Sequence, residues 1–206
     1  MNVKICGIQN EESALFAIEN GADALGFVFA ESTRKILPPA AKKIISRLPK
    51  ETIKVGVFVN PSREMVDEIV AVTGINVVQL HGNETPEFCA SLPYSVIKAF
   101  SIESREDLEK VDDYSSCEYV LLDGPKGKYY GGNGISFDWE MLSTFDFKHK
   151  KVILAGGLNS ENAGIAIKQK AVDMLDVSSG VETNGKKDLS KIKKFITAVK
   201  QTEFIS

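Results

Sequence analysis

The chain has 206 residues, of which 43% are hydrophobic and 26% are charged, and its formal net charge at pH 7 is −3. These values exclude a disordered or fibrous chain, and they give no sign of the clustered positive charge that a nucleic-acid-binding surface needs. The length suits one domain over residues 1–206, which would bury about 70% of the surface that the unfolded chain exposes.

Apolar runs alternate with amphipathic segments along the first half of the chain. Each run ends at a glycine, an asparagine or a polar loop, after which apolar residues recur at helical spacing. This pattern predicts four strand–helix units. The predicted strands cover residues 3–6, 24–29, 53–59 and 77–80, and the helices cover residues 10–20, 38–48, 63–73 and 85–92.

The second half repeats this alternation. Its predicted strands cover residues 95–100, 119–123, 151–154 and 172–177, and its helices cover residues 104–110, 137–142, 159–169 and 189–200. The longest irregular segment, residues 124–136, contains Gly131-Gly132-Asn133-Gly134. Long loops rich in glycine are often active-site lids, so we expect a lid here, with a disordered loop tip as the alternative.

Eight units in 206 residues leave roughly 26 residues for each, and the known lengths of (β/α)8 barrels begin near about 200 residues. No linker or break in composition divides the chain. We therefore predict the α/β class and a single-domain (β/α)8 TIM barrel. A doubly wound open sheet is the competing architecture.

Cysteine and histidine are too few and too scattered for a disulfide framework or a metal site. Cys6, Cys89 and Cys117 have no paired spacing, which favours a reducing compartment, and Cys89 and Cys117 are expected to be inert. His81 and His149 belong to no ligand-spaced cluster. The chain has no signal-type apolar core and no apolar stretch of about 20 residues. We expect a cytoplasmic protein that binds neither membrane nor nucleic acid.

The loops that follow the strands build the active site in this fold, so the residues at the strand exits should surround one cleft. Two of these residues, Cys6 and Asp123, can exchange protons near neutral pH if their pKa values are shifted. The reference pKa is about 8.5 for a cysteine thiol and about 3.9 for an aspartate carboxyl. Raising the pKa of the acid and lowering that of the thiol would make an acid–base pair. The expected ring is Cys6, Arg34, Asn60, His81, Phe100, Asp123, Gly156 and Ser178.

Cys6 and Asp123 are the candidates for this pair. Asp123 directly follows a strand that reads as buried on both faces, where a charge is costly unless it lines a cleft. Cys6 ends the first strand just before Gly7. The alternatives are that Cys6 is a small core residue and that Asp123 caps the following turn.

Two neighbouring loops after the last two strands predict an oxyanion site. Their small residues, Gly156 and Gly157 in one loop and Ser178, Ser179 and Gly180 in the other, would let backbone N–H groups approach a bound anion. Phosphate usually binds at this place in such barrels, so we expect a small phosphorylated substrate. The alternative is that the glycines only form tight turns.

Three other positions carry charge near the expected cleft. Arg34 could hold a carboxylate through two parallel hydrogen bonds, unless it is a solvated surface arginine. Lys4 and Asp176 should form an interior ion pair once the barrel closes, which would either help to ionise Cys6 or be purely structural. His81 could contact a ligand or pack at its strand end.

Six motifs at six strand ends together resemble the phosphoribosylanthranilate isomerase family of tryptophan biosynthesis. The resemblance runs from residue 4 to about residue 196. The motifs are Lys4-Ile5-Cys6-Gly7, Ser32-Thr33-Arg34, Val78-Gln79-Leu80-His81-Gly82, Leu122-Asp123 with Gly131-Gly132-Asn133-Gly134 and Phe137-Asp138-Trp139, Leu154-Ala155-Gly156-Gly157-Leu158, and Asp176-Val177-Ser178-Ser179-Gly180-Val181-Glu182.

This resemblance implies an Amadori rearrangement with no cofactor, in which N-(5-phosphoribosyl)anthranilate becomes 1-(2-carboxyphenylamino)-1-deoxyribulose 5-phosphate. It implies that Asp123 is the general acid for the furanose ring oxygen and that Cys6 is the general base for the C2′ proton. Arg34 matches the residue expected at the anthranilate carboxylate, and the last two loops match the phosphate site. Asn133 and Thr33 depart from the family's usual threonine and proline, so we expect altered lid contacts with intact chemistry.

Two rival functions follow from the same residues. A sister isomerase of another phosphoribosyl compound, such as that of the histidine pathway, would carry a carboxylate at position 6. A non-catalytic sensor of a phosphorylated metabolite would keep the glycine loops and make Cys6 and Asp123 incidental.

Overall fold

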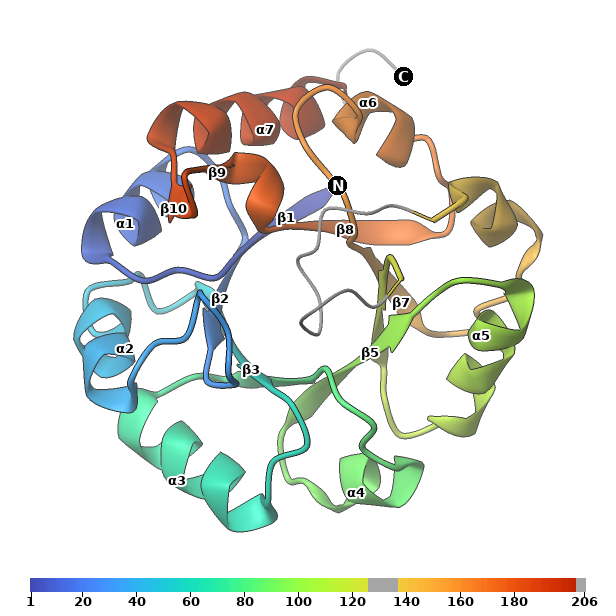
Figure 1. Cartoon of the computed structure of the whole chain (residues 1–206), viewed down its shortest axis with the longest axis horizontal. Coiled ribbons are helices and arrows are strands. Elements are labelled where there is room, and N and C mark those ends of the chain that lie inside the picture. Colours follow the sequence, from blue (N-terminus) through green and yellow to red (C-terminus); the bar gives the residue numbers. More distant parts are fainter. Residues whose placement is uncertain (126–136, 203–206) are drawn as a thin grey trace.

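Eight parallel strands pair in sequence order, and the first also pairs with the eighth, which closes the sheet into a barrel. The computed structural model describes residues 1–125 and 137–202, and Figure 1 shows the ring of strands inside a ring of helices. This closure confirms the predicted (β/α)8 barrel and rules out the open sheet. The strands are β1 (Asn2–Cys6), β2 (Ala24–Val28), β3 (Ile53–Phe58), β4 (Val77–Leu80), β5 (Ser95–Ser101), β6 (Tyr119–Asp123), β7 (Lys151–Leu154) and β8 (Val172–Val177).

The helices begin where short polar side chains cap exposed backbone N–H groups. Asn10, Ser62 and Thr85 each accept a hydrogen bond from the N–H three residues later, which stabilises the first turn of α1, α3 and α4. The α-helices are α1 (Glu11–Glu19), α2 (Pro38–Ile45), α3 (Arg63–Thr73), α4 (Pro86–Ser91), α5 (Arg105–Glu109), α6 (Ala163–Ala166) and α7 (Leu189–Thr202). Short 3₁₀ segments are η1 (Lys110–Asp113), η2 (Trp139–Thr144) and η3 (Ser179–Val181), and a hairpin joins β9 (Glu182–Thr183) to β10 (Lys186–Lys187).

The helix predicted over residues 159–169 is wrong in extent, because only α6 is α-helical there. Asn159 Oδ1 accepts from the N–H groups of Glu161 and Asn162, and Asn162 Nδ2 donates to Gly157 O at 2.9 Å. These side chains hold the backbone in turns that compete with a helix. The helix predicted over residues 137–142 is instead η2, which starts after Asp138 and extends to Thr144.

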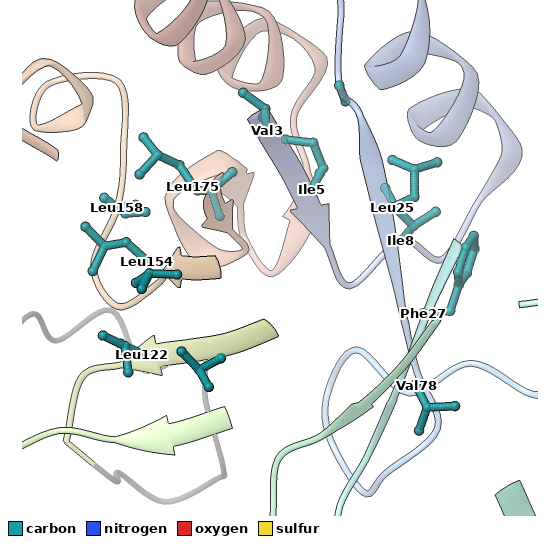
Figure 2. Packing of buried hydrophobic residues seen from close by; sticks show 14 of the residues in the cluster. Val3, Ile5, Ile8, Leu25, Phe27, Val78, Leu122, Leu154, Leu158 and Leu175 are labelled. Atoms are coloured by element: carbon teal, nitrogen blue, oxygen red, sulfur yellow. The ribbon is translucent and has the colours of Figure 1, made fainter. Parts of the chain in front are cut away.

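Alternate residues of each strand pack into two separate apolar layers. Side chains of one parity fill the barrel interior, and those of the other parity pack between the strands and the helices. On β5, for example, Ile97 and Ala99 belong to the interior cluster, whereas Phe100 belongs to the outer one. Figure 2 shows labelled members of the outer layer on several strands, among them Val3, Leu25 and Leu154.

The carboxyl ends of the strands are where polar side chains enter the interior. Lys4, Gln79, Asp123 and Asp176 are all buried there. Burial of charged groups in a barrel interior is costly unless they are paired or serve a site. Within residues 1–125 and 137–202, no helix has the length and apolar composition that a membrane crossing requires.

Candidate active site

A cavity of about 490 Å³ opens at the carboxyl ends of the strands. This volume lies in the range of small-molecule binding sites. Its apolar walls come mainly from β2, β3 and the loops after β2 and β7, and its polar groups come from the loop after β2 and from the ends of β1, β4, β6 and β8. The polar side chains that line it include Cys6, Arg34, Gln79, His81, Asp123, Asp176, Ser178 and Ser179.

Two members of the predicted ring lie outside this cavity. Phe100 projects to the outer layer because its strand parity is opposite to that of Ala99, and it packs edge-on against Tyr114 at 5.1 Å between ring centroids. Asn60 instead links two loops, with its N–H donating to Glu84 Oε1 at 2.7 Å and its Oδ1 accepting from Asn83 N–H at 2.7 Å. The ring prediction used position along the strand without the alternation of side chains, so it was wrong at these two residues.

Cys6 stands at the end of β1 with its side chain in the barrel interior. Gly26 is its register partner on β2, and a Cβ at Gly26 would lie 2.7 Å from the Cys6 Sγ. The thiol therefore occupies space that only a glycine leaves free. Burial raises the pKa of Cys6 above its usual value, even though Lys4 acts to lower it. The acid–base pair predicted from the sequence required a lowered pKa for this thiol, and the shift in the structure is in the opposite direction.

The interior ion pair between Lys4 and Asp176 is present as predicted. Lys4 Nζ lies 2.9 Å from Asp176 Oδ2, and the Lys4 side chain is 0% exposed. Burial opposes the charge on Lys4, but Asp176 and Cys6 outweigh it and raise the pKa of Lys4. Lys4 thus stays cationic beside the thiol, where it offsets part of the cost of burying a thiolate.

Asp123 ends β6 and contacts the exit of β4. Its Oδ1 accepts a hydrogen bond from Gly124 N–H at 2.8 Å, and its Oδ2 lies 3.5 Å from His81 Nε2. Gln79 Nε2 lies 3.2 Å from His81 Nδ1. His81 therefore lies between Gln79 and Asp123, with one ring nitrogen facing each of them. Sequence reasoning placed His81 at the cleft but missed Gln79 as its partner.

Two buried acceptors in the cavity wall lack partners. Neither Gln79 Oε1 nor Asp176 Oδ1 has a hydrogen-bond partner among the described residues. Buried oxygens without partners are rare in folded proteins, and they point to donors supplied by a ligand. Both residues line the cavity beside Cys6 and Asp123.

The two glycine loops lie against each other at the cavity edge. Gly156 and Gly157 have positive φ angles of 84° and 65°, which favour glycine. A Cβ at Gly180 would lie only 1.8 Å from Leu158 O, so the loop after β8 approaches the loop after β7 at main-chain contact. Gly156, Gly157, Ser178 and Ser179 line the cavity, whereas Gly180 lies behind it and permits the close packing.

Arg34 also lines the cavity, but its two parallel hydrogen bonds go to a carboxylate of the protein itself. Arg34 Nε donates to Glu182 Oε1 at 2.7 Å and Nη2 donates to Glu182 Oε2 at 2.8 Å. Its side chain is 17% exposed, which rules out a solvated surface arginine. Sequence reasoning missed Glu182, although it ends the Asp176–Glu182 motif.

Cys89 and Cys117 are buried and lie outside the cavity lining. The two thiols are hydrogen-bonded to each other, which raises the pKa of Cys89 and lowers that of Cys117 to about 7. No group of three or more histidine, cysteine or acidic side chains among the described residues is placed to hold a metal ion. The predicted lid glycines and Asn133 lie outside the described residues.

The fold and the cavity define a class, the (β/α)8 barrels whose small-molecule cavity at the strand ends is lined by titratable side chains. Residues 3–198 match the family model described as N-(5'-phosphoribosyl)anthranilate (PRA) isomerase. The chain belongs to this family. It is an isomerase of N-(5'-phosphoribosyl)anthranilate, which acts in tryptophan biosynthesis.

Individual relatives match this chain over nearly its whole length. The N-(5'-phosphoribosyl)anthranilate isomerase of Bacillus cereus (strain AH187) is 50% identical over 202 residues, covering 98% of both chains. The crystal structure of the Thermotoga maritima enzyme has a TM-score of 0.91 and 41% identity, covering 98% of this chain and 99% of that one. A further phosphoribosyl anthranilate isomerase, solved with reduced 1-(o-carboxyphenylamino)-1-deoxyribulose 5-phosphate, has a TM-score of 0.88 and 40% identity, with coverage of 98% and 99%.

These findings decide between the functions that the sequence left open. A family match across residues 3–198 excludes a non-catalytic sensor and a sister isomerase of the histidine pathway. The residue at position 6 agrees, because it is a cysteine and not the carboxylate expected for the sister enzyme.

Proposed function

We propose that Cys6 and Asp123 perform the isomerisation as general base and general acid on one phosphorylated pentose. One observation carries this proposal: the two side chains come from strands that are not neighbours in the barrel, yet they line the same cavity of about 490 Å³. The glycine loops after β7 and β8 line that cavity too. A substrate anchored there by its phosphate would lie between the two groups.

The phosphate is proposed to bind at Gly156, Gly157, Ser178 and Ser179, with Gly180 holding the two loops together. Backbone N–H groups in such loops stabilise a bound oxyanion. The complex of a relative with a reduced, phosphorylated ketose supports a ligand of this kind in the present chain.

Ring opening is assigned to Asp123. Its carboxyl proton passes to the furanose ring oxygen while the bond from that oxygen to C1′ breaks, and the anthranilate nitrogen forms the C=N bond of a cationic Schiff base. His81 faces Asp123 through Nε2 and supports this group from the side of β4. The step leaves a carboxylate on Asp123 and a hydroxyl on the opened sugar.

Proton removal from C2′ is assigned to the thiolate of Cys6. Burial makes the thiolate a minority form in the free enzyme, but the positive charge of the Schiff base favours it in the complex. Removal of the C2′ proton yields the enolamine. Proton delivery to C1′ by the Cys6 thiol and proton loss from the C2′ hydroxyl to Asp123 then give the ketone and restore both groups.

The unpartnered acceptors are proposed to hold the sugar. Gln79 Oε1 and Asp176 Oδ1 line the cavity without donors among the described residues, and the pentose hydroxyls supply donors of the right kind. Such hydrogen bonds fix the C2′ proton relative to Cys6, and orientation of this kind contributes strongly to rate.

The experiment is a fluorescence assay with freshly made N-(5-phosphoribosyl)anthranilate, whose fluorescence disappears on turnover. Each proton transfer is typically worth about 10²–10⁴ in rate, so Cys6→Ala and Asp123→Asn should each lose about that factor while still binding a reduced product analogue. Cys89→Ala, a buried cysteine outside the cavity, is the matched control and should keep its activity. Undiminished isomerisation by either cavity variant would refute the assigned roles.

We further propose that residues 1–206 act as one domain in a reducing compartment, the cytoplasm. The closed barrel uses strands from Asn2 to Val177, and α7 returns to the start of the chain, where Lys200 Nζ donates to Met1 O at 3.2 Å. All three cysteines are free, which supports the reducing compartment.

A further inference from the structure

Three charged side chains form a buried cluster beside the cavity. Glu182 accepts two hydrogen bonds from Arg34, at 2.7 and 2.8 Å, and one from Lys187 Nζ at 2.6 Å. The side chains of Glu182 and Lys187 are only 7% and 3% exposed. Burying charged groups this completely costs desolvation free energy, which suggests that the cluster serves the neighbouring cavity.

Among the residues that the structure describes, the bonds to Glu182 use only part of the Arg34 guanidinium. An arginine has five N–H donors in a rigid plane, and Glu182 engages Nε and one N–H of Nη2. The remaining donors lie on the outer edge, on Nη1 and Nη2, and Arg34 lines the cavity. That edge suits a second carboxylate, bound end-on.

The orientation of this edge is held from two sides. The stem of Arg34 packs over Gly7, where a Cβ would lie 2.6 Å from Arg34 Cδ, and Glu182 fixes the plane of the head group. Lys187 Nζ also donates to Ser178 O at 3.0 Å. Glu182 therefore connects Arg34 to the loop after β8 that lines the cavity.

We propose that Glu182 is a positioning residue that orients the outer edge of the Arg34 guanidinium toward the ring carboxylate of the substrate. Through Lys187, Glu182 also fixes the position of Arg34 relative to the loop after β8. The inference rests on the proposed function. It makes Glu182 a determinant of specificity for substrates that carry an ortho carboxylate on the aromatic amine.

The test compares two inhibitors in binding assays, the reduced product analogue and the same compound without its ring carboxylate. Glu182→Gln should weaken the carboxylated analogue by about tenfold or more, the scale of a misaligned charge-assisted hydrogen bond. The analogue without the carboxylate should lose less than about threefold. In an Arg34→Ala background, Glu182→Gln should have little further effect on the carboxylated analogue, because the two residues act as one unit.

Equal losses for both analogues, or losses that add in the double variant, would overturn the proposal and leave Glu182 as a strut of the β9–β10 hairpin. If Glu182→Gln does not fold, Glu182→Asp retains the charge but shortens the side chain, and it should show the same selective loss. A wild-type enzyme that binds both analogues equally would instead refute the contact of Arg34 with the anthranilate carboxylate that the family resemblance implies, and would leave the roles of Cys6 and Asp123 untouched.

Discussion

At the residue scale, burial and charge act in opposite directions on Cys6. Burial raises the pKa of the thiol most strongly, Lys4 and Lys187 lower it, and Asp176 raises it. Lys4 is locked in place by Asp176 at 2.9 Å. The free enzyme therefore holds a protonated thiol, and the base forms only as pH rises or as the substrate becomes cationic.

This balance predicts the pH dependence of kcat/KM, which reports groups of the free enzyme. A base whose pKa is raised gains its active form at higher pH than usual. The inflection that Cys6 sets in this profile should therefore lie above about 8.5, the reference pKa of a thiol. A plot of kcat/KM against pH checks this, and a profile with no inflection above about 8.5 would show that another group is the base.

Gly26 provides a second test at the same scale. A Cβ there would lie 2.7 Å from Cys6 Sγ and 3.1 Å from Cys6 Cα, so Gly26→Ala must displace the thiol. Misplacement of a reacting group by about 1 Å costs up to about 10²-fold in rate, and kcat should fall on that order. Gly164→Ala is the control, because nothing lies within 4 Å of a Cβ at that position. Equal kcat values for the two variants would mean that Cys6 is not the base.

At the scale of elements, the loops after β7 and β8 work as one unit. Gly180 packs against Leu158 O so closely that any side chain would push the two loops apart. The proposed phosphate site requires this contact, since its lining residues come from both loops.

Gly180→Ala should therefore weaken phosphate binding more than it weakens the fold. We expect the inhibition constant of inorganic phosphate to rise by about tenfold, corresponding to the loss of a charge-assisted hydrogen bond or two. Competitive inhibition assays measure this, with a urea denaturation curve as the control for folding. An unchanged inhibition constant in a folded variant would place the phosphate elsewhere.

The alternation of short strands and helices was enough to predict most elements from the sequence. Residues 77–80, 151–154 and 172–177 form strands with the predicted ends, because each is an apolar run between polar or glycine-rich loops. The helix over residues 159–169 was not predictable in extent, since Asn159 and Asn162 bind the backbone in turns. Asn60 and Phe100 were misplaced because side-chain parity was not applied at the strand exits.

At the scale of the whole molecule, barrel closure determines which distant residues meet. Lys4 and Asp176 are register partners on β1 and β8, so a closed barrel alone predicted their ion pair. The contact of Arg34 with Glu182 depends on the path of the loop after β8, which no local pattern reveals. The cost of burying Cys6 also depends on the whole fold, and this is why the direction of its pKa shift was missed.

The central claim is that Asp123 opens the ring and Cys6 then acts on the opened sugar within one cavity. The most direct measurement is reductive trapping of the open-chain Schiff base by cyanoborohydride during incubation of each variant with substrate. Cys6→Ala should accumulate the trapped open-chain amine faster than the uncatalysed reaction, whereas Asp123→Asn should not exceed it. Trapping at equal rates in both variants, or only in Asp123→Asn, would contradict this division of roles.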